Sequence, residues 1–265
     1  MPRPIKNTLQ QTGFRALMAT QFLEAFNDNA LKVVVTFVAI DYFVAHGMGN
    51  LFVSLSGVVF IAPFLFFSTY AGYLADRFSK KNIIVIAKVA ELLILLLGLA
   101  AFIKINMWGM LAVLFLMGLH SAFFSPSKYA ILPEILHEDD LSEGNGQLQM
   151  WTYAAIILGQ AGGGYLLQVF NAQVFKAYFV FIGIAAVGIL TSLLVPNVPA
   201  AGSKRKMEWN FIKEIVGSIS YVKANRTIFL SIIGLVYFAF LGGIFQPNIL
   251  LYARQMMEVD HILSS

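Results

Sequence analysis

Apolar residues occur in long runs along this chain rather than in alternation with polar ones. The stretches 92–103, 107–119 and 174–195 hold few polar side chains. No water satisfies backbone N–H and C=O groups inside a bilayer, so such runs must close their own hydrogen bonds as helices. A span needs roughly 20 residues. We therefore predict seven membrane-spanning helices, at residues 14–45, 51–75, 83–103, 107–132, 147–169, 177–195 and 227–252.

The amino-acid composition also indicates that the chain lies in a lipid bilayer. Of the 265 residues, 58% are hydrophobic and only 12% are charged, whereas about 25% of a soluble domain is charged. The formal net charge is +4. The basic residues lie at the ends of the apolar runs, so we expect them to set membrane topology and we expect no nucleic-acid partner. The chain has no cysteine, which excludes disulfides and thiolate chemistry.

The basic residues are divided unequally between the two sides of the predicted membrane. One side has only Lys104, Lys176 and Arg254. An excess of lysine and arginine marks the cytoplasmic side, so we predict a multi-pass protein with a cytoplasmic N-terminus. The richer side carries Arg3, Lys6, Arg15, Arg77, Lys80, Lys81, Lys204, Arg205, Lys206, Lys213, Lys223 and Arg226.

These patterns divide the chain into three parts. Residues 1–195 are predicted to form a six-span bundle. Residues 196–226 form a cytoplasmic linker that contains a basic cluster and an amphipathic helix, which lies either along the headgroups or beneath the bundle. Residues 227–265 hold the seventh span and the start of a second bundle. The tail does not resemble a natural domain end, so we expect a truncated chain.

The first span carries an unusual set of polar side chains. Glu24, Asp28 and Lys32 are spaced four apart and share one helix face, and Asn27 lies beside them. Each ionisable group within a bilayer costs roughly 2.5–3.5 kcal/mol, so these groups should face a bundle interior or a wet cavity. Two interpretations remain open: Asp28 and Lys32 neutralise each other, or the face forms a site for a substrate or coupling ion.

The link between the second and third spans also has a distinctive pattern. Gly72 would let helices approach closely, and Asp76 could pair with neighbouring helix ends. Arg77, Lys80 and Lys81 could hold two cytoplasmic loops in one state. We predict a role for these five residues in conformational gating; the alternative is an ordinary basic loop.

Three further polar residues lie within apolar runs of the third and fourth spans. Lys88 and Glu91 are three residues apart, and we predict that they form an internal structural pair. His120 is interpreted as a neutral, hydrogen-bonded helix contact, and a proton carrier is the alternative.

The end of the fourth span combines a proline with a cation. Pro126 removes one helix hydrogen bond and exposes carbonyl groups. Lys128, beside this break, suits an anionic phosphate as a point-charge ligand. Alternatively, Lys128 extends to the membrane interface or pairs with Glu134.

The fifth span contains a small-residue face. Gly159 and Gly163 are four apart, a spacing that allows close helix packing. Elsewhere the sequence has no Walker loop, no HExxH motif and no His-x4-Asp motif. We therefore expect no metal, no cofactor and no enzymatic activity.

Several of these motifs together resemble the lysophospholipid transporter family of the major facilitator superfamily. The similarity covers most of residues 14–195, and Ser79 departs from it because the usual loop pattern has glycine there. It lies in Phe26-Asn27-Asp28-Asn29-Ala30-Leu31-Lys32, in the Asp76 loop, in Ser125-Pro126-Ser127-Lys128-Tyr129 through Leu132-Pro133-Glu134, and in Asn145-Gly146.

The resemblance implies an all-α membrane protein with the major facilitator fold, here an N-terminal six-helix bundle plus the first helix of the second bundle. It implies alternating-access movement of lysophospholipid, chiefly lysophosphatidylethanolamine, across the bacterial inner membrane. In this reading Asp28 meets the amine or forms part of a gate, and Lys128 meets the phosphate. Glu24, Asn27 and Lys32 complete the candidate substrate-binding set.

Two other functions remain open at this point. The chain could belong to a facilitator for another small solute or drug. It could also be the membrane module of a fused acyltransferase and acyl-carrier-protein synthetase, because the transporter family also occurs in that fusion. Membrane lipid and such an acyltransferase or synthetase are the expected partners besides the substrate.

Overall fold

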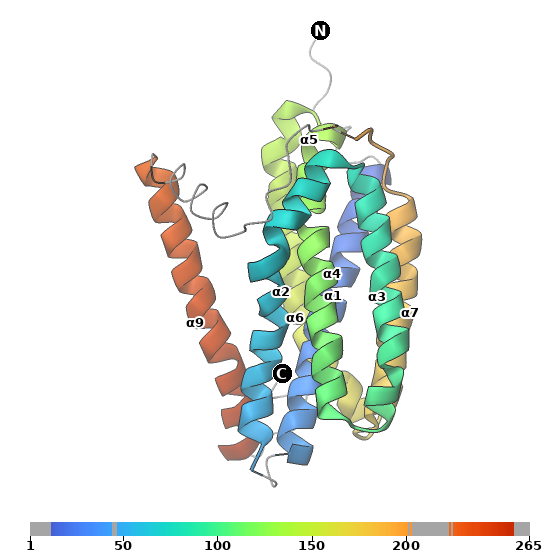
Figure 1. Cartoon of the computed structure of the whole chain (residues 1–265), viewed down its shortest axis with the longest axis vertical. Helices are drawn as coiled ribbons and strands as arrows, with labels where there is room; N and C mark the ends of the chain where they lie inside the picture. Colours follow the sequence, from blue (N-terminus) through green and yellow to red (C-terminus); the bar gives the residue numbers. More distant parts are fainter. Residues whose placement is uncertain (1–11, 44–46, 201, 203–222, 224, 257–265) are drawn as a thin grey trace.

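The computed structural model describes residues 12–43, 47–200, 202, 223 and 225–256, and these residues are mainly helical (Figure 1). The basic cluster Lys204–Lys206 and the amphipathic segment 208–222 lie outside the described residues, so the predicted division into three parts stays a prediction. The helices are α1 Thr12–Phe43, α2 Gly49–Arg77, α3 Lys80–Ile103, α4 Met107–Ala130, α5 Leu132–Ile135, α6 Leu141–Val169, α7 Val174–Leu193 and α9 Arg226–Met256, with a 3₁₀ turn, η2, at Glu138–Asp140.

Tight turns make successive long helices run in opposite directions. Asn106 caps α4 by accepting a hydrogen bond from the backbone N–H of Gly109 at 3.1 Å. Ile105, Asn171 and Ala172 take positive φ in the turns after α3 and α6. Those two turns lie at the end of the bundle opposite α5 (Figure 1).

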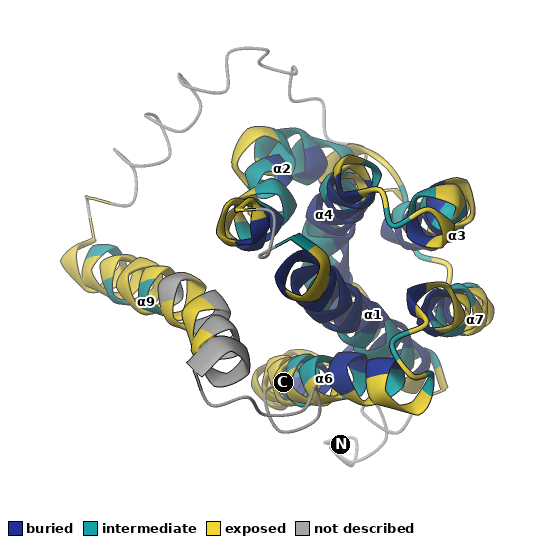
Figure 2. Ribbon diagram, turned by 90° about the horizontal axis from the view of Figure 1, so that it is seen from below, coloured by how far each residue is buried: buried dark blue, intermediate teal, exposed yellow. Residues whose placement is uncertain are grey.

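Helix α1 occupies the centre of the bundle. It packs against α2, α4, α6 and α7, while α3 packs against α4 and α7 (Figure 2). From Ala30 to Ile40 nearly every side chain of α1 is buried. An apolar core forms around this stretch, with Phe37, Tyr178 and Phe181 among its fully buried members. The central position explains why α1 tolerates charged groups: its neighbours are protein rather than lipid.

Glycines allow α6 to approach α1 closely. A Cβ added at Gly159 would lie 2.6 Å from the backbone oxygen of Phe26, and one added at Gly163 would lie 2.6 Å from that of Ala30. Any larger side chain would push the two helices apart.

Five of the described helices are long and apolar enough to cross a membrane: α2, α3, α4, α7 and the first part of α9. The sequence predicted seven spans. The two others, α1 and α6, have sufficient length, but α1 carries Glu24, Asp28 and Lys32 and α6 carries glutamines and several glycines. Several of their polar groups contact other helices, as Asn27 contacts Glu91 and Gln149 contacts Tyr129, and a count of apolar residues does not detect such contacts.

Helix α9 lies beside the bundle rather than in it. It contacts chiefly α2 and α1, and its described side chains are almost all exposed (Figure 2). A large apolar helix surface of this kind is typical of a segment that packs against lipid or further protein.

Candidate functional site

The first buried polar cluster joins α1, α3, α4 and α7. The carboxylate of Glu91 accepts hydrogen bonds from Lys88 and, at 2.7 Å, from the Asn27 side chain. The Nε2 atom of His120 lies 3.8 Å from the same carboxylate. Asn27 also donates to the backbone oxygen of Phe181 at 3.3 Å. Glu91 of α3 thus connects to α1 through Asn27 and lies beside α4 at His120, and Asn27 extends the cluster to α7.

Lys88 and Glu91 form the predicted ion pair, and both side chains are completely buried. His120 donates a hydrogen bond of 2.6 Å from Nδ1 to the Met117 backbone oxygen, in agreement with its interpretation as a helix contact. Gly188 of α7 provides the space for Lys88, because an added Cβ would lie 2.6 Å from its Cε. Glu91 has two donors in this cluster, while Oδ1 of Asn27 and Nε2 of His120 have no hydrogen-bond partner among the described residues. The fully buried ion pair gives the cluster the character of a structural brace.

The second cluster is incompletely satisfied. Ser121 of α4 donates a hydrogen bond of 2.6 Å to Oδ2 of Asp28, while Oδ1 of Asp28 has no partner among the described residues. Glu24 is buried one turn away, and its Oε2 also lacks a partner there. Gln21, on the same side of α1, donates to Thr152 at 3.1 Å but leaves its oxygen unsatisfied. Buried acceptors without donors are costly and are typical of sites that receive a ligand or water.

Asp28 and Lys32 form no direct ion pair among the described residues, although their charges interact electrostatically. Mutual neutralisation therefore stays an open alternative to a binding site. Lys32 donates to Asn29 at 3.1 Å and lies 5.6 Å from the centre of the Phe60 ring. Asp28 has a short side chain and reaches across to α4, whereas the longer Lys32 side chain extends toward α2.

Lys128 approaches the same region from the end of α4. It is 9% exposed, so it does not extend to the interface, and its ammonium lies 5.2 and 5.7 Å from the Tyr129 and Phe124 ring centres. Lys128 forms no ion pair with Glu134 among the described residues, and that carboxylate is paired with Lys80. The charge of Lys128 interacts electrostatically with Glu24 and Asp28, with no ion pair to either acid among the described residues. The region therefore holds one buried cation and two incompletely satisfied acids.

The residues assigned to gating lie around the turn from α2 to α3. A Cβ on Gly72 would meet nothing within 4 Å, so the expected close helix approach at Gly72 is absent from the described structure. Asp76 is exposed and forms no ion pair with a described residue. Arg77 donates to the hydroxyl of Tyr73. Lys80 is buried and connects the start of α3 to α5 through Glu134, and Lys81 is half-buried.

Sequence reasoning missed two residues at these clusters, Ser121 and Gly188. Ser121 follows His120 directly in an otherwise apolar helix, and this polar pair was the available signal. Gly188 gave no signal, because its role depends on Lys88 approaching from another helix. Among the described residues, no group of three or more His, Asp or Glu side chains could hold a metal ion.

A known protein family matches most of the chain. Residues 17–265 match the family model of the Major Facilitator Superfamily. The chain belongs to this superfamily. Its membership confirms the predicted fold: an all-helical, multi-pass membrane protein of the major facilitator type.

The curated proteins similar to this chain are named as one kind of transporter. The chain is 29% identical over 207 residues to "Lysophospholipid transporter LplT" of Enterobacter sp. (strain 638), covering 77% of this chain and 48% of that protein. The protein of the same name from Serratia proteamaculans (strain 568) is 28% identical over 201 residues, 75% of this chain and 46% of that protein. The predicted similarity to lysophospholipid transporters is confirmed. The chain spans about half the length of these relatives.

Solved structures of superfamily transporters share the fold. A bacterial homologue of the human lysosomal transporter Spinster, in an inward-facing and unoccupied conformation, superposes with a TM-score of 0.64 at 17% identity, covering 96% of this chain and 58% of that one. A POT family transporter in complex with a thioalcohol-conjugated peptide gives 0.57 at 16% identity, covering 93% and 51%. At these identities the likeness describes architecture alone.

Proposed function

We propose that this chain forms the N-terminal bundle of a facilitator-type transporter that moves lysophospholipid, chiefly lysophosphatidylethanolamine, across the bacterial inner membrane. Transport proceeds by alternating access, and no bond in the substrate is made or broken. The N-terminus and the α2–α3 turn face the cytoplasm, as the lysine and arginine distribution indicates. The names of the curated relatives support this substrate class.

The observation that carries the proposal is the pair of incompletely satisfied buried acids, with a buried cation whose charge interacts with both. Lysophosphatidylethanolamine has an ammonium group and a phosphate in one headgroup. In this proposal Asp28, with Glu24 beside it, receives the ammonium through the free carboxylate oxygen, while Lys128 receives the phosphate. Asn27 holds Glu91 in place, and Lys32 adds a second cation near the site.

The gating residues take a separate part in the proposal. Lys80 bound to Glu134 fastens the start of α3 to α5, and Asp76, Arg77 and Lys81 remain at the exposed end of the bundle. Exposed charges at such a position can exchange partners between conformations at little cost, because surface ion pairs contribute only about 0–1 kcal/mol.

Uptake of labelled lysophosphatidylethanolamine into spheroplasts tests this function. Asp28→Asn keeps the shape and the Ser121 contact but removes the charge, and Lys128→Ala removes the cation. Each should lower uptake about tenfold or more, since a hydrogen bond to a charged group contributes roughly 1.5–3 kcal/mol. Lys104→Ala, at the exposed turn between α3 and α4, is the matched control and should leave uptake unchanged. Normal uptake by both site variants would contradict the assignment.

Competition distinguishes the substrate class in the same assay. Unlabelled lysophospholipids should suppress the signal, whereas sugars and small cationic drugs should not. Suppression by the sugars or drugs alone would instead support a facilitator for another solute.

A further inference from the structure

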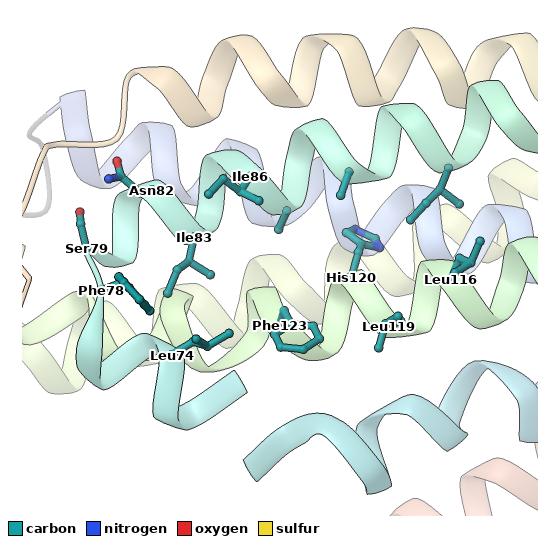
Figure 3. A pocket seen from close by; sticks show the side chains of 13 residues that line it. Leu74, Phe78, Ser79, Asn82, Ile83, Ile86, Leu116, Leu119, His120 and Phe123 are labelled. Carbon is teal, nitrogen blue, oxygen red and sulfur yellow. The ribbon is translucent and has the colours of Figure 1, made fainter. Parts of the chain in front are cut away.

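An apolar groove runs along the outside of the bundle, and only His120 of the first polar cluster reaches its lining. It is formed by the end of α2, the first half of α3 and the middle of α4, and has a volume of about 550 Å³. Figure 3 shows side chains from all three helices lining it, among them Leu74, Ile83, Leu119 and Phe123. Apart from His120, Ser79 and Asn82, the lining is hydrocarbon.

The groove has the length and exposure of a site for a lipid chain. Its α3 wall extends from Asn82 to Ile94, which is about 18 Å at 1.5 Å per residue. One leaflet contributes half of a hydrocarbon core about 30 Å thick, so the groove spans the depth of one leaflet. Ile86, on its rim, is 67% exposed, which leaves the side of the groove open to surrounding lipid.

Cations gather where the groove meets the membrane surface. The guanidinium of Arg77 lies 5.9 Å from the ring centre of Phe78, a groove residue. Lys81 directly precedes the lining residue Asn82 and, unlike Lys80, forms no ion pair with a described residue. Asp76 is the acid in this turn, so the three side chains give a net positive charge.

The start of α3 adds to this positive potential. No side chain caps the N-terminus of this 24-residue helix, because Ser79 instead donates its hydroxyl to the Val198 backbone oxygen at 2.8 Å. Free N–H groups and the helix dipole favour an anion at such a position.

We infer that this groove binds one acyl chain of an anionic membrane phospholipid, whose phosphate lies at Arg77, Lys81 and the N-terminus of α3. The occupant is a resident diacyl lipid of the adjoining leaflet and not the transported molecule. The apolar lining suits the chain, and the cationic mouth suits the headgroup. The inference concerns a different face from the proposed substrate site and does not depend on the transport function.

Photo-crosslinking of the full chain in nanodiscs tests the site. The discs contain phosphatidylcholine with a small fraction of either phosphatidylglycerol or phosphatidylcholine bearing a photoreactive acyl chain, and adducts are mapped by peptide mass spectrometry. Ala90→Phe fills the groove from α3. The matched control is Leu97→Phe on the same helix, at a side chain that is 80% exposed and outside the groove. Thermal unfolding establishes that both variants fold.

The expected result is adducts concentrated on the groove segments of α3 and α4, several-fold more with phosphatidylglycerol than with phosphatidylcholine. Ala90→Phe should reduce them several-fold and Leu97→Phe should not. The double variant Arg77→Gln/Lys81→Gln should remove the preference for the anionic lipid. Adducts spread evenly over the exposed apolar helices, or equal yields from both lipids on the unchanged chain, would overturn the inference, as would a folded Ala90→Phe variant with undiminished groove labelling.

Discussion

At the scale of single residues, the buried acids of the bundle differ in how completely they are hydrogen-bonded. Glu91 has a partner on each side, because Lys88 and Asn27 both donate to it and His120 lies nearby. Asp28 and Glu24 each keep an oxygen without a described partner. A satisfied network rigidifies a bundle, while an incomplete one is costly unless something else completes it. The carboxylates differ in this respect, which separates the structural acid Glu91 from the candidate binding acids Asp28 and Glu24. Asn27 and His120, beside Glu91, each keep one atom without a described partner.

The structural pair should be sensitive to removal of one member. Lys88→Met or Glu91→Gln leaves an uncompensated charge or an unpaired lysine in the interior, and each should lower the free energy of unfolding by about 3–5 kcal/mol. Lys88→Met/Glu91→Met removes both charges and should lose much less than the sum of the two single changes. Denaturant or thermal unfolding of the reconstituted protein measures this, and additive losses would show that the two groups act independently.

The identities of the charged residues were predictable from sequence, but their partners were not. Spacing on one helix left open whether Asp28 pairs with Lys32, and it did not reveal that Ser121 of α4 donates to Asp28 or that Lys32 donates to Asn29. The Lys88–Glu91 pair was predicted correctly because both members lie on one helix and are its only charges within the apolar run. Contacts between helices depend on how the helices pack. Residue spacing within one helix does not reveal that packing.

At the scale of helices, apolar run length predicted positions well. The first helix was expected at 14–45 and lies at Thr12–Phe43, and the fourth was expected at 107–132 and lies at Met107–Ala130. The fifth span begins earlier than predicted, at Leu141, because polar turns of α6 continue the helix beyond the apolar stretch. Hydropathy detects the lipid-contacting part of a helix, and helical hydrogen bonding does not end where that part ends.

Close packing of α6 on α1 gives a prediction about glycine. Gly159→Ala places a methyl group 2.6 Å from the Phe26 backbone oxygen, so the helices must separate, at a cost of about 1–3 kcal/mol. Gly183 of α7 has nothing within 4 Å of an added Cβ, and Gly183→Ala is the control. Unfolding midpoints of the two variants should differ clearly. A Gly159→Ala variant as stable as the control would mean that α6 does not approach α1 as described.

At the scale of the whole molecule, alternating helix direction places the basic turn between α2 and α3 at one end and the turn between α3 and α4 at the other (Figure 1). The chain has no native cysteine, so single introduced cysteines report orientation without background. In intact spheroplasts, a membrane-impermeant thiol reagent should label Lys104→Cys and spare Lys81→Cys until the membrane is opened. The reverse pattern would invert the proposed topology.

The central claim is that the acid on α1 faces a hydrated chamber that receives a charged headgroup. Thiol labelling of an Asp28→Cys variant tests it most directly, with Val34→Cys, in the fully buried core of the same helix, as the unreactive control. The account predicts that a small water-soluble reagent modifies position 28. Failure of position 28 to react under any condition, as completely as position 34, would contradict it.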